Sequence, residues 1–208
     1  MIPTTPIEGG DSLPIGASFW TPDLSALTED EGFGFFRDTW PILDIPHEFA
    51  QQVVSTERII VDCLSQLASS PAHYERLAQI VENWDPDVIE EDLSSGEHAA
   101  ISGILRNADD NPLDSLELGV SGLSLALSSI GAYPAASCRG HGTAHAWSRC
   151  PVVYFAATRS TAVAVESALQ KSACRFVLDD ARPTLLCVAG SSALDTNQLA
   201  SALLEHES

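Results

Sequence analysis

The 208-residue sequence contains 29 Asp and Glu residues against 10 Lys and Arg residues, so its formal net charge is −19. Hydrophobic residues make up 45% of the chain, which is enough for a sizeable core and excludes a mainly disordered protein. The charge excludes nonspecific binding to nucleic acid or to an anionic membrane, because both need a positively charged protein surface. A basic protein partner fits this charge better, as does a simple contribution to solubility.

The negative charge is confined to the first part of the chain. Residues 1–130 contain 23 acids and 4 bases, whereas residues 131–208 contain six of each. Between Glu117 and Glu166 no acidic residue occurs, although three arginines and two histidines fall in that interval. The sequence therefore predicts two surfaces of different character, one acidic and one locally basic.

Cysteine use and the N-terminal residues predict a cytoplasmic protein. The first six residues contain no positive charge and no apolar run, so they do not resemble a secretory signal. Five cysteines are an odd number, which is typical of free thiols in a reducing compartment. The longest apolar stretch, residues 120–138, is interrupted by glycine, proline and serine, so no membrane span is expected.

Residues 1–46 predict an irregular, proline-rich arm. Six of the fourteen aromatic residues fall between Phe19 and Trp40, and such side chains need a surface to pack on. We expect the arm to wrap the protein's own core; the alternative is a docking surface for a partner.

Residues 47–110 predict an acidic helical region. Apolar residues recur at helical spacing on both sides of a Ser-Ser-Pro turn at residues 69–71, which indicates a helical hairpin. Ser94 and Glu97 have capping-box spacing at the start of a later helix.

Five acids lie together between these helices. A solvated helix face and a surface that binds a basic partner both fit such a cluster. The residues are Asp85, Asp87, Glu90, Glu91 and Asp92.

Residues 111–208 predict an α+β sheet domain, although the whole chain can equally form one compact unit. Asn111 and Pro112 are suited to begin a strongly apolar helix, which Gly131 ends. Strands are expected at 132–138, 151–157, 174–179 and 183–189, with helices at 159–170 and from Asp195 onward. The order α-β-β-α-β-β-α predicts an α+β fold in which the helical N-terminal region packs with a small mixed four-stranded sheet.

Reactive side chains are concentrated in residues 137–150, directly after the first expected strand. Loops at strand ends are common places for functional sites. One interpretation is a zinc site, because thiolates and imidazoles at short spacing suit tetrahedral zinc. The four candidate ligands are Cys138, His141, His145 and Cys150.

A second interpretation makes Cys138 a catalytic nucleophile, with His141 or His145 as its general base. Guanidinium groups nearby would bind an anionic part of the substrate, because they pair bidentately with phosphate or carboxylate. These arginines are Arg139, Arg149 and Arg159.

A third interpretation is structural. Cys138 is then a small buried hydrophobe, His141 a hydrogen-bonded turn residue, and the arginines are partners of the acidic N-terminal part. Walker, dinucleotide-binding, His-Glu-x-x-His and nucleophile-elbow motifs do not occur in the sequence.

The leading hypothesis from the sequence is an acidic protein-binding module, of inhibitor or immunity type, that neutralises a basic protein partner. Mimicry of nucleic acid by the acidic face is a further possibility. The alternative is an enzyme or metal-dependent site, with zinc or no cofactor, in which Cys138, His141 and His145 act on a small anionic substrate.

Overall fold

The computed structural model describes residues 1–23, 25, 43–83, 93–105, 113–141 and 148–205. The helices in this part of the chain are α1 (His47–Leu67), α2 (Pro71–Glu82), α3 (Ser95–Leu105), α4 (Ser121–Ser129), α5 (Arg159–Leu169) and α6 (Ala193–Leu204). The strands are β1 (Tyr133–Cys138), β2 (Val152–Ala156), β3 (Arg175–Phe176) and β4 (Leu186–Ala189). The predicted α+β class and the order α-β-β-α-β-β-α, from α4 to α6, are confirmed.

The four strands form one sheet in the order β1-β2-β4-β3. Every pairing is antiparallel, so the expectation of a mixed sheet was wrong. The reason is topological. β1 and β2 are neighbours in both sequence and space, and α5 carries the chain to β3 at the edge of the sheet. The chain reverses between β3 and β4, so β4 lies between β3 and β2 and runs antiparallel to both.

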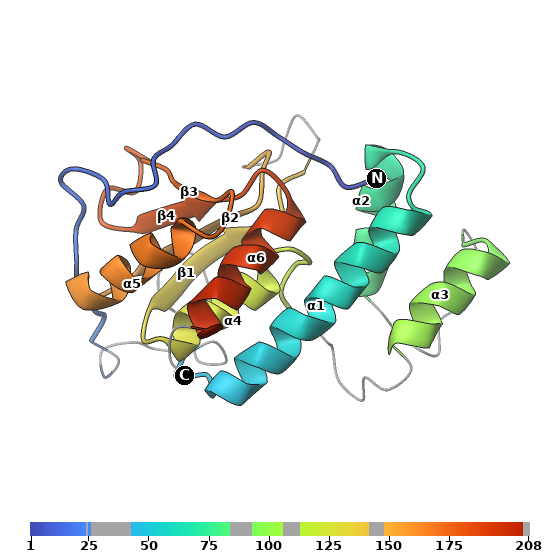
Figure 1. Ribbon diagram of the computed structural model, residues 1–208, viewed down its shortest axis with the longest axis horizontal. Helices are drawn as coiled ribbons and strands as arrows, with labels where there is room; N and C mark the ends of the chain where they lie inside the picture. Colours follow the sequence, from blue (N-terminus) through green and yellow to red (C-terminus); the bar gives the residue numbers. More distant parts are fainter. Residues whose placement is uncertain (24, 26–42, 84–92, 106–112, 142–147, 206–208) are drawn as a thin grey trace.

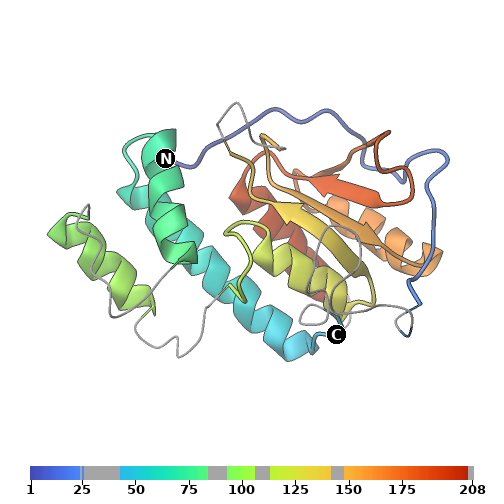
Figure 2. The same cartoon turned by 180° about the vertical axis from the view of Figure 1, so that it is seen from behind.

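One face of the sheet is covered by α4, α5 and α6 (Figures 1 and 2). Side chains alternate across a strand, so Val153 and Phe155 of β2 enter this helix-covered core. Val152 and Tyr154 point to the opposite face, where they pack in a smaller cluster that includes Cys138. The thiol of Cys138 therefore lies on the face away from the helices.

The predicted helical hairpin is α1 followed by α2. Pro71 occupies the first turn of α2, and the hydroxyl of Ser70 accepts a hydrogen bond from the backbone of His73. At α3, Ser94 and Glu97 form the predicted capping box: the Ser94 amide donates to Glu97 Oε2 at 2.7 Å, and the Glu97 amide donates to Ser94 Oγ at 3.3 Å. None of the described helices is both long enough and apolar enough to cross a membrane.

The strongly apolar helix begins later than predicted. α4 starts at Ser121, and the described residues before it form turns, with positive φ at Asp114 (52°), Ser115 (63°) and Gly119 (91°). Gly131, with φ of 80°, ends the helix as predicted. All residues from Ser121 to Ser128 are buried, which confirms that this helix is central.

A buried carboxylate explains why the chain turns before α4. Glu57 of α1 is fully buried, and its Oε1 accepts a hydrogen bond from the Gly119 amide at 2.8 Å. Its Oε2 accepts from the Asn197 side-chain amide at 3.1 Å. Burial raises the pKa of Glu57, although these hydrogen bonds oppose the shift. This residue ties α1, α4 and α6 together.

The last helix begins earlier than predicted. α6 begins at Ala193, two residues before the predicted Asp195, and the Ser192 hydroxyl donates to Asp195 Oδ2. Thr196 and Asn197, in the first two turns of α6, are buried. They bond inward to the Gly119 carbonyl and to Glu57.

The described part of the N-terminal arm packs on the protein's own core. Gly10 forms an isolated antiparallel bridge with Phe176 of β3, which extends the sheet at that edge. Phe19 packs against the main core, and the Trp20 indole donates to the Thr184 carbonyl. Residues 26–42 of the arm lie outside the described part of the chain.

Candidate metal centre

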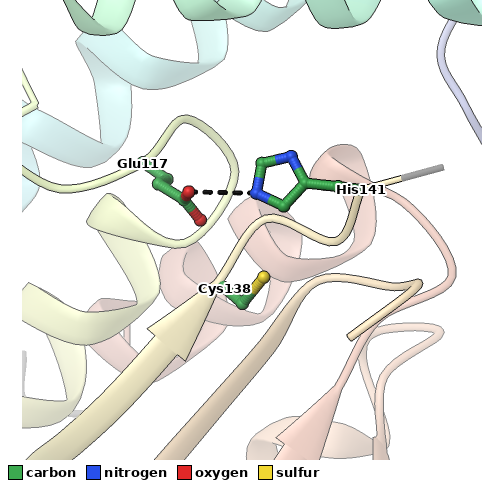
Figure 3. A group of neighbouring side chains, drawn as sticks. All are labelled: Glu117, Cys138 and His141. Carbon is green, nitrogen blue, oxygen red and sulfur yellow. Dashed lines mark hydrogen bonds and ion pairs between the residues drawn. The ribbon is translucent and has the colours of Figure 1, made fainter. Parts of the chain in front are cut away.

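Three potential metal ligands meet at the end of β1. They are Glu117 from the turn before α4, Cys138 from the last position of β1, and His141 from the loop that follows (Figure 3). One ligand atom from each residue lies within 4.8 Å of the others. Two of the four zinc ligands predicted from the sequence are therefore brought together, with a carboxylate as the third member.

The backbone after β1 explains how His141 reaches this position. Gly140 has φ of 82°, a conformation that favours glycine, and a Cβ at this position would lie 2.5 Å from the backbone of Cys150. The His141 amide donates to the Ser148 carbonyl at 3.1 Å. Gly140 thus turns the chain tightly, so that His141 folds back beside Cys138.

The imidazole of His141 lies between two carboxylates. Its Nδ1 contacts Glu75 Oε1, and its Nε2 lies 3.1 Å from Glu117 Oε1. Burial lowers the pKa of His141, but the hydrogen bond with Glu75 and the charge of Glu117 outweigh burial and raise it above its ordinary value. Nδ1 therefore has Glu75 as its partner, while Nε2 points toward Glu117, another member of the candidate ligand group.

Arg139 holds these carboxylates in place. Its backbone amide donates to Glu117 Oε2 at 2.7 Å, which leaves Oε1 of that carboxylate facing His141. Its guanidinium is buried and donates to Glu75 at 2.9 Å and to Glu82. Arg139 thus pairs with the acidic N-terminal part, as the structural interpretation predicted.

Glu82 connects this network to the turn that carries Glu117. Its Oε1 accepts a hydrogen bond from the Leu118 amide at 2.8 Å. Burial raises the pKa of Glu82 in spite of Arg139. For Glu75, burial is outweighed by His141 and Arg139, and its pKa is lowered.

Negative charge exceeds positive charge in this network. Three carboxylates, those of Glu75, Glu82 and Glu117, face the single permanent positive charge of Arg139, and His141 supplies a second only when protonated. Buried or half-buried charges are stable when they are paired. A divalent cation between Glu117, Cys138 and His141 would supply the missing positive charge.

Cys138 lacks the features of an activated nucleophile. Only 1% of its surface is exposed, and burial raises its pKa to about 11. The Gly140 amide donates to its sulfur at 3.3 Å, but the charge of Glu117 disfavours the thiolate. A bound metal ion changes this balance, because a coordinating thiol is deprotonated.

The donor set fits zinc. Ligand atoms around a tetrahedral zinc ion are about 3.3–3.8 Å apart, given bonds of about 2.0–2.3 Å. The separation of 3.1 Å between His141 Nε2 and Glu117 Oε1 is close to that spacing, and the whole group lies within 4.8 Å. Thiolate and imidazole together select zinc over magnesium or calcium, which prefer oxygen ligands.

Two other predicted site residues, Cys150 and Arg159, lie outside the ligand group. Cys150 is half-buried and its sulfur contacts the Ser148 hydroxyl at 3.9 Å, so it is not a member of the ligand group. Arg159 stacks over the Phe19 ring, 5.2 Å from its centroid, at the start of α5. His145 and the five predicted partner-binding acids at 85–92 lie outside the described residues.

The sequence pattern missed Glu117, Glu75 and Glu82. Glu117 is the last acid before the acid-free interval, and it falls within the range of the helix predicted from Asn111 to Gly131. Its position in a turn became evident only from the positive φ values before α4. Glu75 and Glu82 are seven residues apart on α2, a spacing that places both on one helix face. This spacing is the sequence feature that could have indicated that the two carboxylates act together.

Comparisons with known proteins add no identification. No family model matches the chain, and no similarity to a curated protein or to a solved structure reaches significance.

Proposed function

We propose that this protein is a zinc-dependent protein, with a centre formed by Glu117, Cys138 and His141. The observation that carries the proposal is the position of His141. Its Nε2 faces Glu117, while its Nδ1 contacts the carboxylate of Glu75. Metal-binding histidines in proteins are commonly oriented in this way by a carboxylate on the second ring nitrogen.

Three protein ligands among the described residues favour a catalytic rather than a structural zinc ion. Structural sites use four protein ligands, whereas catalytic sites use three and leave a position for water or substrate. Zinc in such a site lowers the pKa of bound water and polarises carbonyl or phosphoryl groups. The reaction class that fits is zinc-assisted hydrolysis or addition on a small substrate, in agreement with the metal-dependent alternative from the sequence.

The proposal is tested by metal content. Protein purified without chelators is dialysed against zinc, and bound zinc is measured by elemental analysis and by competition with a chromophoric chelator. We expect one zinc per chain in the wild type and loss of that zinc in Cys138→Ser. Cys63→Ser is the matched control, because Cys63 is a free, half-buried cysteine on α1 outside the ligand group. Equal zinc content in wild type and Cys138→Ser would overturn the proposal.

Binding to a basic protein is a second candidate function, and the net charge of −19 supports it. Part of the acidic excess is used internally, because Glu75 and Glu82 pair with Arg139. The excess that is left favours fast, salt-sensitive association with a positively charged surface. Binding to a panel of basic proteins should weaken steeply between low and high ionic strength; affinity that is independent of salt would contradict this function.

A further inference from the structure

Two cysteines lie next to each other where the chain reverses at the metal centre. Cys138 is the partner of Val152 in the pairing of β1 with β2. Two residues further on, Gly140 approaches the neighbouring chain so closely that a Cβ on it would lie 2.5 Å from the backbone of Cys150. Cys150 is therefore two residues out of register with Cys138. Residues two apart on a strand point to the same face, so both side chains lie on the sheet face away from the helices.

Both sulfur atoms contact the same short stretch of backbone. Cys138 belongs to the apolar cluster on this sheet face, and Cys150 packs against that cluster. The Cys138 sulfur accepts a hydrogen bond from the Gly140 amide at 3.3 Å and another from the backbone of Ser148. The Cys150 sulfur lies 3.9 Å from the Ser148 hydroxyl. One residue, Ser148, thus contacts both sulfurs.

Gly140 brings the two chains close enough for a disulfide. Positions two residues out of register on one face of a regular antiparallel pair have Cα atoms about 7–8 Å apart, whereas disulfides join Cα atoms about 4.4–6.8 Å apart. Any side chain at residue 140 would collide with the Cys150 backbone, so glycine permits an approach that a regular pair does not reach. Cys138 and Cys150 are thereby brought toward the range of a disulfide.

The other three cysteines are less well placed to pair with Cys138. Cys187 lies opposite Tyr154 in the pairing of β2 with β4, so β2 separates it from β1. Cys174 lies in the helix-covered core on the opposite face of the sheet, and Cys63 lies on α1.

We propose that Cys138 and Cys150 form a reversible disulfide, which competes with the metal ion for the Cys138 sulfur. The thiolate is the form of cysteine that binds a metal ion, so oxidation removes one of the three ligands. The effect on zinc rests on the proposed zinc centre, but formation of the disulfide does not. Oxidation then regulates the centre, which holds zinc in the reduced protein and releases it in the oxidised one.

A hydroperoxide is the class of oxidant that balances the reaction. Hydrogen peroxide oxidises the more accessible Cys150 thiol to a sulfenic acid and is itself reduced to water. The Cys138 sulfur then attacks the Cys150 sulfur, the S–O bond breaks, and the sulfenic hydroxyl leaves as a second water with the Cys138 proton. Two thiols and one peroxide thus give one disulfide and two waters. The second step is intramolecular, so proximity replaces the activation that a catalytic thiol requires.

Disulfide mapping in the wild type tests the pairing. Metal-free protein is reduced, freed of reductant and treated with hydrogen peroxide; remaining thiols are alkylated, and linked peptides are identified by mass spectrometry. We expect a disulfide between Cys138 and Cys150, its removal by dithiothreitol, and slower formation when zinc is present. Cys187→Ser is the matched control, because Cys187 is buried in the same apolar cluster, and it should form the disulfide as the wild type does. No disulfide in the wild type, or one that joins Cys150 to Cys187, would overturn the proposal.

Zinc affinity tests the consequence. Reduced Cys150→Ser should bind zinc as the wild type does, because Cys150 is outside the ligand group. Peroxide should weaken zinc binding by the wild type more than about 100-fold, beyond the range for loss of an outer partner, and dithiothreitol should restore it. Cys150→Ser treated in the same way should keep its affinity, and an equal reversible loss in both proteins would overturn the regulation. A wild type that forms the disulfide but binds no zinc when reduced would overturn the zinc centre alone.

Discussion

A single buried carboxylate lies on one side of the turn before α4, and a group of three carboxylates lies on the other. The two sides differ in how their negative charge is balanced. Glu57 lies on the core side, where backbone amides and Asn197 surround it and no cation from the described part of the chain contacts it. Glu75, Glu82 and Glu117 lie on the other side, where one buried arginine and a histidine face three carboxylates. The Glu57 carboxylate is hydrogen-bonded on both oxygens, whereas the group on the other side carries more negative than positive charge.

The same residue type serves two purposes around one turn. The Gly119 amide donates to Glu57, and the Leu118 amide donates to Glu82. The turn is thus fixed from both sides, which places Glu117 beside Cys138 without requiring flexibility. A rigid support of this kind is what a metal site needs for its geometry.

The largest expected effect is on folding, from Glu57→Ala. This change removes the acceptor of the Gly119 amide and of the Asn197 side chain, and leaves buried donors unpartnered. We expect a loss of about 3–5 kcal/mol in the free energy of unfolding, measured by urea denaturation in the presence of a chelator. Asp62→Asn, which breaks only the exposed pair with Arg58, should cost less than about 1 kcal/mol. A similar loss in both variants would contradict the structural role assigned to the buried Glu57 carboxylate.

The next effect is on zinc, from His141→Ala. Loss of a direct ligand should weaken zinc affinity by more than the roughly 100-fold upper range for loss of an outer hydrogen-bonding partner. Zinc should also cease to raise the thermal midpoint of this variant. His73→Ala is the control, because His73 pairs with Glu97 at 2.8 Å outside the ligand group. If His141→Ala retained wild-type affinity, the centre would be misassigned.

A smaller effect is expected from Glu75→Gln. The amide oxygen can still accept from His141, but it no longer carries the charge that orients the ring and pairs with Arg139. Zinc affinity should fall about 10-fold with the stoichiometry still at one per chain, as competition titration would show. Complete loss of zinc would instead make Glu75 a direct ligand.

The smallest effect is on the pH dependence of the free energy of unfolding, and it concerns Glu57. Burial raises the folded-state pKa of Glu57, so the folded protein binds more protons than the unfolded chain between the ordinary pKa and the raised one. The contribution of Glu57 to stability is therefore greatest below the unfolded pKa of 4.5 and falls as pH rises through the folded pKa, by at most about 1.4 kcal/mol per pH unit. In metal-free Glu57→Gln this part of the pH dependence should disappear; an unchanged profile would assign it to other groups.

Much of the fold was predictable, because periodicity and end signals are local. The Ser-Ser-Pro turn, the Ser94–Glu97 capping box and the stop at Gly131 all appear where expected. The start of α4 was not predictable from Asn111 and Pro112. It depends on Glu57, which is far away in the sequence and binds the turn instead of letting the helix extend.

The candidate site was only half predictable, for the same reason. Cys138 and His141 are close in sequence, so the loop could be singled out. Glu117 and Glu75 come from elements 21 or more residues away, and they meet His141 only in the folded chain. Arg139 was expected to bind a substrate through its whole guanidinium, but its Nη atoms are used by Glu75 and Glu82.

The central claim is a metal ion bound by a thiolate, an imidazole and a carboxylate, and cobalt substitution tests it most directly. Metal-free protein is titrated with Co²⁺, and its absorption spectrum is recorded for the wild type, Cys138→Ser and Cys63→Ser. We predict saturation at one Co²⁺ per chain, with a thiolate-to-cobalt charge-transfer band and the intense visible bands of a tetrahedral site. Both should be present in Cys63→Ser, whereas Cys138→Ser should lack the charge-transfer band. A wild-type spectrum identical to that of aqueous Co²⁺, or a charge-transfer band that persists in Cys138→Ser, would contradict the assignment.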